Sequence, residues 1–159
     1  MNIILFRHGD AEDHSPGIND AGRKLTPKGE AITRQNVNLI KQLTGTPDYI
    51  VSSPLLRARQ TAEIIAAEMN YTSEILVDEK LSSGSESNDV IDIANYLDAP
   101  NILFVGHQPD LSKHVSYMIS SSGAAVEFRK SSAAKISFSK KAAPGRGVLE
   151  FLIPPVQEK

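Results

Sequence analysis

Polar side chains follow directly on two apolar runs of the sequence. Arg7 and His8 come straight after the apolar residues 3–6, and His107 follows residues 102–105 after one glycine. Short runs rich in branched and aromatic residues are typical of buried strands. Ligands of an open α/β sheet bind at the carboxyl ends of its strands, so we expect these side chains to share a pocket.

A second arginine belongs to the same edge of the predicted sheet. Arg57 lies one turn after Ser53 and Pro54, a pair typical of a helix start, and close to the apolar residues 49–51. Two arginines and two histidines would repel one another in an empty pocket. They suit a phosphate dianion, whose oxygens accept several hydrogen bonds and which matches the planar fork of arginine.

Such a pocket can carry out phosphoryl transfer. A neutral imidazole can attack phosphorus and form a phosphohistidine, which divides one difficult displacement into two easier ones. The remaining cationic groups would hold the oxygens of the transition state. These residues alone do not decide whether His8 or His107 is the nucleophile. The scheme needs no metal and no other cofactor, and the sequence offers no convincing set of metal ligands.

Alternating strand and helix patterns predict the scaffold that positions these residues. Four strands are expected at residues 3–6, 49–51, 75–77 and 102–105, and helices at about 27–43, 54–70, 90–97 and 111–119. Two further strands, at 134–138 and 148–153, are joined by a turn rich in Pro and Gly. We therefore predict an α/β fold with three α/β/α layers, a mostly parallel central sheet and an antiparallel C-terminal hairpin.

The composition is that of an ordinary globular protein. Of the 159 residues, 23% are charged and 40% are apolar, which fits a single domain over residues 1–159 with a frayed tail at 154–159. A net charge of -2 disfavours nucleic acid as a partner. The absence of cysteine excludes disulfides and cysteine-based phosphatase chemistry. Neither a signal peptide nor an apolar run of membrane-spanning length is present, which predicts a cytoplasmic protein without a membrane partner.

Three blocks of the sequence resemble the histidine phosphatase superfamily, which is also called phosphoglycerate mutase-like. The matching residues are Arg7, His8 and Gly9; Ser52, Ser53, Pro54, Leu56, Arg57, Ala58, Thr61 and Ala62; and Gly106, His107 and Pro109, together with Leu25, Thr26, Pro27 and Gly29. The short chain is similar to the SixA-type phosphohistidine phosphatases of this family. The resemblance implies that His8 is the nucleophile and that Arg7, Gly9, Arg57 and His107 bind the phosphate.

Two departures from the family pattern bear on the substrate. Many relatives place an acidic proton donor shortly after the third strand, where this sequence has Lys80; Glu79 and Glu86 are the nearby candidates for a general acid. Losing such an acid costs ~10²- to 10⁴-fold when an alkoxide must leave. An imidazole that is protonated on its other nitrogen can leave neutral without it. The short chain also has little room for a large lid insertion, and an uncovered pocket admits a protein surface.

These features together favour a phosphatase that hydrolyses phosphohistidine on a protein, such as a phosphotransfer domain, and that works as a monomer. One alternative is a broad-specificity phosphomonoesterase for small molecules, and another is a non-catalytic module that binds phosphoproteins. A mutase is disfavoured because it needs a closed site that keeps water from the intermediate. His14 and His114 are expected to be surface or structural residues.

Overall fold

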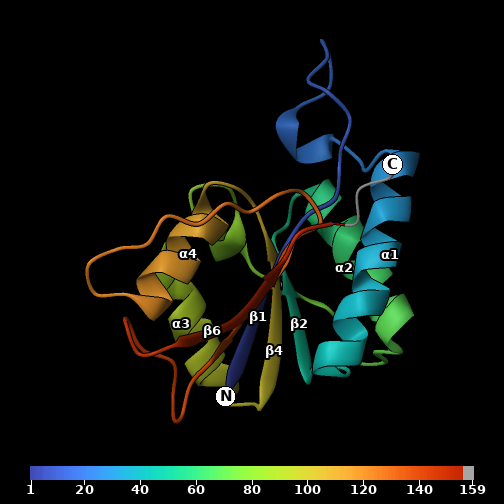
Figure 1. The fold of residues 1–159 in the computed structure, drawn as a ribbon. Coiled ribbons are helices and arrows are strands. Elements are labelled where there is room, and N and C mark those ends of the chain that lie inside the picture. Colours follow the sequence, from blue (N-terminus) through green and yellow to red (C-terminus); the bar gives the residue numbers. More distant parts are fainter. Residues whose placement is uncertain (156–159) are drawn as a thin grey trace.

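The computed structural model describes residues 1–155, and part of the tail for which fraying was predicted, residues 156–159, lies outside the described residues. Six strands form one sheet in the order β3-β2-β4-β1-β5-β6 (Figure 1). The strands are β1 (Asn2–Arg7), β2 (Tyr49–Ser52), β3 (Leu76–Val77), β4 (Asn101–Gly106), β5 (Ala133–Ser137) and β6 (Val148–Ile153). The first four pair in parallel, while β5 and β6 are antiparallel, which confirms the predicted mixed sheet and its C-terminal hairpin.

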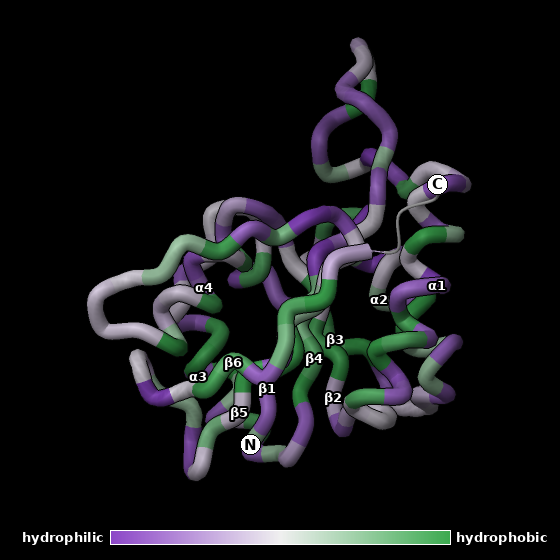
Figure 2. Tube along the Cα trace, in the orientation of Figure 1, coloured by the Kyte–Doolittle hydropathy of each residue, from purple (hydrophilic) through white to green (hydrophobic). Residues whose placement is uncertain are grey.

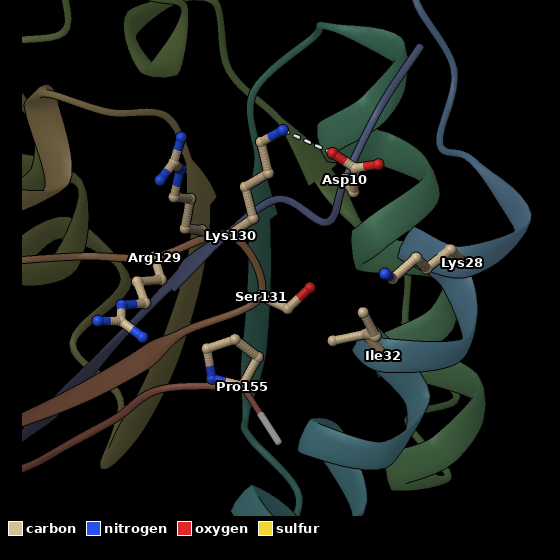
Figure 3. Close-up of a pocket in the computed structure, with 8 residues that line it drawn as sticks. Asp10, Lys28, Ile32, Arg129, Lys130, Ser131 and Pro155 are labelled. Atoms are coloured by element: carbon tan, nitrogen blue, oxygen red, sulfur yellow. Dashed lines mark hydrogen bonds and ion pairs between the residues drawn. The ribbon is translucent and has the colours of Figure 1, made fainter. Parts of the chain in front are cut away.

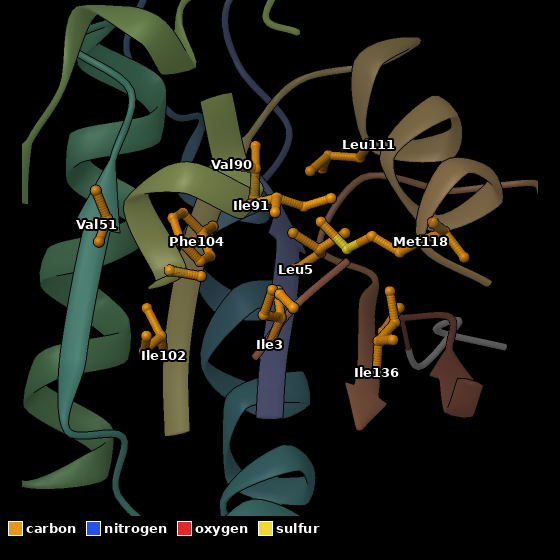
Figure 4. Packing of buried hydrophobic residues seen from close by; sticks show 14 of the residues in the cluster. Ile3, Leu5, Val51, Val90, Ile91, Ile102, Phe104, Leu111, Met118 and Ile136 are labelled. Atoms are coloured by element: carbon orange, nitrogen blue, oxygen red, sulfur yellow. The ribbon is translucent and has the colours of Figure 1, made fainter. Parts of the chain in front are cut away.

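Helices cover both faces of this sheet. The helices are α1 (Pro27–Thr44), α2 (Leu56–Met69), α3 (Ser87–Leu97) and α4 (Asp110–Ile119), with 3-10 turns η1 (Asp20–Gly22) and η2 (Glu79–Leu81). Successive strand residues point to opposite faces. Ile3 and Leu5 therefore pack with residues of α3 and α4 (Figure 4), whereas Ile4 and Phe6 pack with α1 and α2. The predicted three layers are confirmed, and the most hydrophobic segments lie in the central strands (Figure 2).

The start of one helix was predicted correctly and the start of another was not. Thr26 caps α1 by accepting a hydrogen bond from the backbone N–H of Gly29 at 2.9 Å, and Pro27 is the first helical residue. Helix α2 instead begins at Leu56, and no side chain caps it. The prediction that Ser53 starts this helix was wrong: its hydroxyl accepts from the N–H of Leu55 at 3.3 Å, ahead of the helix, and is hydrogen bonded to His107 at 2.7 Å.

A hydrophilic arm, residues 11–25, separates β1 from α1 and was not assigned any structure from the sequence. An isolated bridge between Ala11 and Leu25 closes its base, and η1 lies near its middle. The arm rises from the carboxyl edge of the parallel strands (Figures 1 and 2). The connection between β5 and β6, residues 138–147, lies at the opposite edge, because β5 runs antiparallel to β1. Within residues 1–155, no helix is long and apolar enough to cross a membrane.

Candidate active site

Strand register brings the four predicted pocket residues to one place. Arg7 and Gly106 are paired across β1 and β4, so His8 and His107 leave the sheet side by side with ring centroids 5.1 Å apart. Arg57, on the first turn of α2, donates through Nε to Nε2 of His8 at 3.3 Å. All four side chains line one cavity of about 180 Å³, whose remaining lining residues are Ala11, Arg23, Ser83, Gln108 and Lys130.

The hydrogen bonds of His8 define its tautomer. Its Nδ1 lies 2.7 Å from the carbonyl oxygen of Gly9, which can only accept, so Nδ1 carries the proton. Its Nε2 accepts from the Arg57 guanidinium and therefore presents a lone pair. Burial lowers the pKa of His8 to about 3, and the positive charges of Arg57 and Arg7 act in the same direction. His8 is consequently a neutral imidazole near pH 7.

Gly9 supports His8 with both of its backbone polar groups engaged. Its carbonyl accepts from His8, and its N–H donates to the hydroxyl of Thr61 at 3.1 Å. A Cβ at this position would lie 2.6 Å from Oγ1 of Thr33, which is closer than real contacts allow. The resemblance implied that Gly9 binds substrate; in the structure its carbonyl is hydrogen bonded to His8 and its N–H to Thr61.

Two buried nitrogen atoms at the cavity have no hydrogen-bond partner among the described residues. One is Nε of Arg7; the Nη1 group of the same side chain donates to the carbonyl of Phe128 at 2.8 Å. The other is Nδ1 of His107, whose Nε2 is held by Ser53. Burial lowers the pKa of His107 to about 4. Buried polar atoms nearly always find a partner, so two unpartnered nitrogens beside Arg57 mark this cavity as a site for an anion.

Asp20, in the arm, is a residue of this site that the sequence did not reveal. Arg57 donates to its backbone oxygen at 2.8 Å and to its carboxylate at 3.0 Å, and Arg23 donates to the same carboxylate at 2.7 Å. Burial acts to raise the pKa of Asp20, but the hydrogen bonds from Arg23 and Arg57 lower it overall. Asp20 thus orients the fork of Arg57, and its low pKa makes it a poor proton donor.

The acidic residues considered as proton donors do not line the cavity. Glu79 lies on η2 and Glu86 precedes α3, and both are exposed. Lys80 is paired with Asp89 at 3.0 Å, away from the two histidines. Ser83 is the residue of this loop that reaches the cavity. In residues 1–155, no three His, Cys, Asp or Glu side chains are grouped so that they could hold a metal ion.

Comparisons with known proteins agree with the geometry of the site. The family model for the histidine phosphatase superfamily (branch 1) matches residues 3–83. An uncharacterized protein of Picosynechococcus sp. is 37% identical over 115 residues, which are 71% of this chain and 70% of that protein. The phosphohistidine phosphatase SixA of Escherichia coli is 30% identical over 115 residues, covering 69% of this chain and 68% of SixA.

The fold is shared with solved structures over nearly the whole chain. A structure of the protein histidine phosphatase SixA complexed with tungstate superimposes with a TM-score of 0.83 and 24% identity, over 96% of each chain. The fold and the site define a phosphatase, and this chain belongs to the histidine phosphatase superfamily.

Proposed function

We propose that this protein hydrolyses phosphohistidine on another protein, with His8 as the group that is phosphorylated during each turnover. The observation that carries the proposal is the tautomer of His8. Its Nδ1 hydrogen is held by the Gly9 carbonyl, and its Nε2 lone pair faces a cavity lined by cationic groups. A neutral, oriented imidazole beside donors for an anion is what nucleophilic attack on phosphorus requires.

The phosphoryl oxygens would be bound by the groups that surround Nε2 of His8. Arg57 is next to this atom, and Arg7 offers its unpartnered Nε–H. If the Ser53 hydroxyl donates to Nε2 of His107, the proton of this ring is on Nδ1, which can donate to the phosphoryl group. Fixed donors of this kind stabilise the charge of the transition state without reorganisation.

In the first step, Nε2 of His8 bonds to phosphorus while the bond between phosphorus and the substrate imidazole breaks. The substrate ring leaves neutral when its other nitrogen is already protonated, so this step needs no general acid. The absence of Glu79 and Glu86 from the cavity lining fits this chemistry. An alkoxide leaving group would require a proton in the transition state, and its reaction would be slower by ~10²- to 10⁴-fold without an acid.

In the second step, water attacks phosphorus and His8 becomes the leaving group. The hydrogen stays on Nδ1 of His8 and remains donated to the Gly9 carbonyl throughout, so His8 also departs as a neutral imidazole. Phosphate takes the oxygen of water, and the proton of water passes to phosphate or solvent. The same backbone hydrogen bond therefore serves both halves of the reaction.

A direct comparison of two substrates tests this specificity. One substrate is a phosphotransfer domain phosphorylated on its histidine, and the other is an alkyl phosphate such as glycerol 3-phosphate, whose alkoxide must be protonated as it leaves. We expect kcat/KM to be higher for the phosphohistidine protein by about 10²-fold or more, because only the ester needs a general acid. An acid-labile, base-stable phosphoenzyme should be trapped on His8 during turnover.

The alternatives give different results in this assay. Slow cleavage of the phosphohistidine protein together with rapid turnover of phosphate esters would replace the proposal by a phosphomonoesterase for small molecules. Binding of the phosphoprotein without release of phosphate, in wild type and His8→Ala alike, would indicate a binding module.

A further inference from the structure

A second, larger groove adjoins the candidate active site. Its volume is about 430 Å³, and it lies between α1 and the segment that precedes β5 (Figure 3). Arg7 and Lys130 line both this groove and the cavity that contains His8, so the two spaces are adjacent. The other lining residues are Asp10, Lys28, Ile32, Arg129, Ser131 and Pro155.

The segment that carries two of these cations is tied to the backbone of the active site. The N–H of Ser131 lies 3.1 and 3.2 Å from the carbonyl oxygens of Arg7 and His8, and the N–H of Arg7 donates to Ser132 at 2.9 Å. The hydroxyl of Ser131 is hydrogen bonded to Thr33 of α1 at 2.9 Å. Arg129 and Lys130 are therefore held in a fixed position relative to His8 by a short, hydrogen-bonded piece of chain.

Positive charge is concentrated in this groove although the chain as a whole is acidic. Four cationic residues and one acidic residue, Asp10, line the groove, whereas the net charge of the chain is -2. Lys130 is paired with Asp10, and Arg129 with Glu127 outside the groove at 3.1 Å. Lys28 has no ion pair among the residues that the structure describes.

Lys28 occupies a position where a lysine does not favour its own helix. It is the second residue of α1, where the helix dipole disfavours a positive charge. A residue that weakens its own element often serves a purpose elsewhere. Here its exposed side chain borders the groove (Figure 3), together with the apolar side chains of Ile32 and Pro155.

We propose that this groove binds an acidic segment of the phosphohistidine-bearing protein, with an apolar side chain of that segment against Ile32 and Pro155. The proposal rests on the proposed function, because the segment belongs to the protein whose phosphohistidine enters the cavity of His8. Complementary charge at this surface accelerates association and selects partners, and it weakens as salt is added. The groove thus distinguishes a protein substrate from a small phosphate compound.

Charge reversal within the groove, compared with an equal reversal far from it, tests this surface. The variant Lys28→Glu/Arg129→Glu changes two exposed residues that are outside the cavity of His8. The matched control, Lys140→Glu/Lys141→Glu, makes the same change of charge in the exposed connection at the opposite edge of the sheet. The substrates are a phosphotransfer domain phosphorylated on histidine and free phosphoramidate, each at low and high salt.

We expect the groove variant to raise KM for the phosphorylated domain about tenfold at low salt, with a smaller difference at high salt. Its kcat/KM for phosphoramidate should equal that of wild type, which also shows that the variant is folded. The control should resemble wild type with both substrates. A second readout is the binding of the phosphorylated domain to His8→Ala protein with and without the groove substitutions, which does not depend on turnover.

Each contrary result has a separate meaning. Hydrolysis of the phosphorylated domain with the same KM in the groove variant and the control would overturn the groove and leave the proposed function intact. Suppose that the wild-type protein binds the phosphorylated domain without hydrolysing it, and that the groove variant does not bind it. This result would support the groove and overturn the proposed function. Faster turnover of the domain, but not of phosphoramidate, by a chain ending at Pro155 would instead support the groove, because residues 156–159 would then compete with the domain for it.

Discussion

The molecule has buried histidines in two regions, and they resemble each other in burial and in pKa but differ in their hydrogen-bond partners. His8 and His107 lie at the cavity, while His114 lies on α4; their exposed fractions are 7%, 3% and 2%. Burial lowers the pKa values to about 3, 4 and 4, respectively. A depressed pKa therefore does not by itself distinguish a catalytic histidine from a structural one.

The hydrogen bonds do distinguish them. His114 uses both ring nitrogens, with Nε2 2.9 Å from the hydroxyl of Ser85 and Nδ1 2.8 Å from that of Ser87. It ties the loop before α3 to α4 and has no atom left for a ligand. At the cavity, His8 presents a lone pair and His107 has an unpartnered nitrogen. The hydrogen-bond partners, rather than burial, separate the two histidines at the cavity from His114: Nε2 of His8 meets the Arg57 guanidinium, and Nδ1 of His107 has no partner among the described residues.

The largest expected difference is in turnover. His8→Ala should reduce kcat for the phosphohistidine protein on the order of 10⁴-fold or more, because the nucleophile is lost. His114→Gln should retain wild-type turnover, since the amide can still bond to both serines. Steady-state kinetics with phosphoenzyme trapping measures both. Comparable losses in the two variants would remove the distinction between the reactive and the structural histidines.

A smaller effect is expected at Arg57, which donates to His8. Arg57→Lys keeps the charge but loses the planar fork that bonds to both His8 and Asp20, so kcat should fall by ~10²- to 10³-fold. Arg59→Lys, an exposed neighbour on the same helix, is the matched control and should have wild-type kinetics. Unchanged activity in Arg57→Lys would show that positive charge alone is sufficient beside His8.

Much of this site was predictable because it depends on strand order. Residues that directly follow buried parallel strands must meet at one edge, and this placed Arg7, His8 and His107 correctly before any geometry was known. The choice between the histidines was different. It needed the family resemblance at first, and the structure then supplied a physical reason in the hydrogen bond from His8 to the Gly9 carbonyl.

The features that were missed depend on contacts between distant residues. Asp20 meets Arg57 across 37 positions of sequence, through an arm without apolar periodicity. Ser53 has the local signature of a helix cap, but its hydroxyl is bonded to His107, 54 positions away. Lys130 reaches the active site because Ser131 is bonded to the backbone of Arg7 and His8. Local patterns carry no information on such pairings.

The third effect is on stability and its dependence on pH. The pKa of His114 is about 4 in the folded protein and near 6.5 when unfolded, so the unfolded chain binds a proton first as the pH falls. Stability present above pH 6.5 is therefore lost as the pH falls towards 4. Between pH 7 and pH 5, the titration of His114 lowers the free energy of unfolding by at most about 2 kcal/mol.

Urea unfolding at several pH values measures how much His114 contributes to the pH dependence of the free energy of unfolding. His114→Gln has no group to protonate here and should lose less stability between pH 7 and 5 than wild type. His8 and His107 have lowered pKa values as well, so part of the acid sensitivity should remain in this variant. Identical pH profiles for wild type and His114→Gln would mean that this histidine is already neutral in the unfolded chain or protonated in the folded one.

The smallest effect is expected at the two glutamates outside the cavity. Glu79→Gln and Glu86→Gln should each change kcat for the phosphohistidine protein by less than about twofold, against the ~10²- to 10⁴-fold loss that follows removal of a general acid. The structural histidine holds Glu86 outside the cavity, because His114 is hydrogen bonded to Ser85 and Ser87 on either side of this glutamate. A large loss in Glu86→Gln would require this loop to move over the cavity during turnover. His114→Gln would then also reduce turnover, and the structural histidine would have become part of a lid.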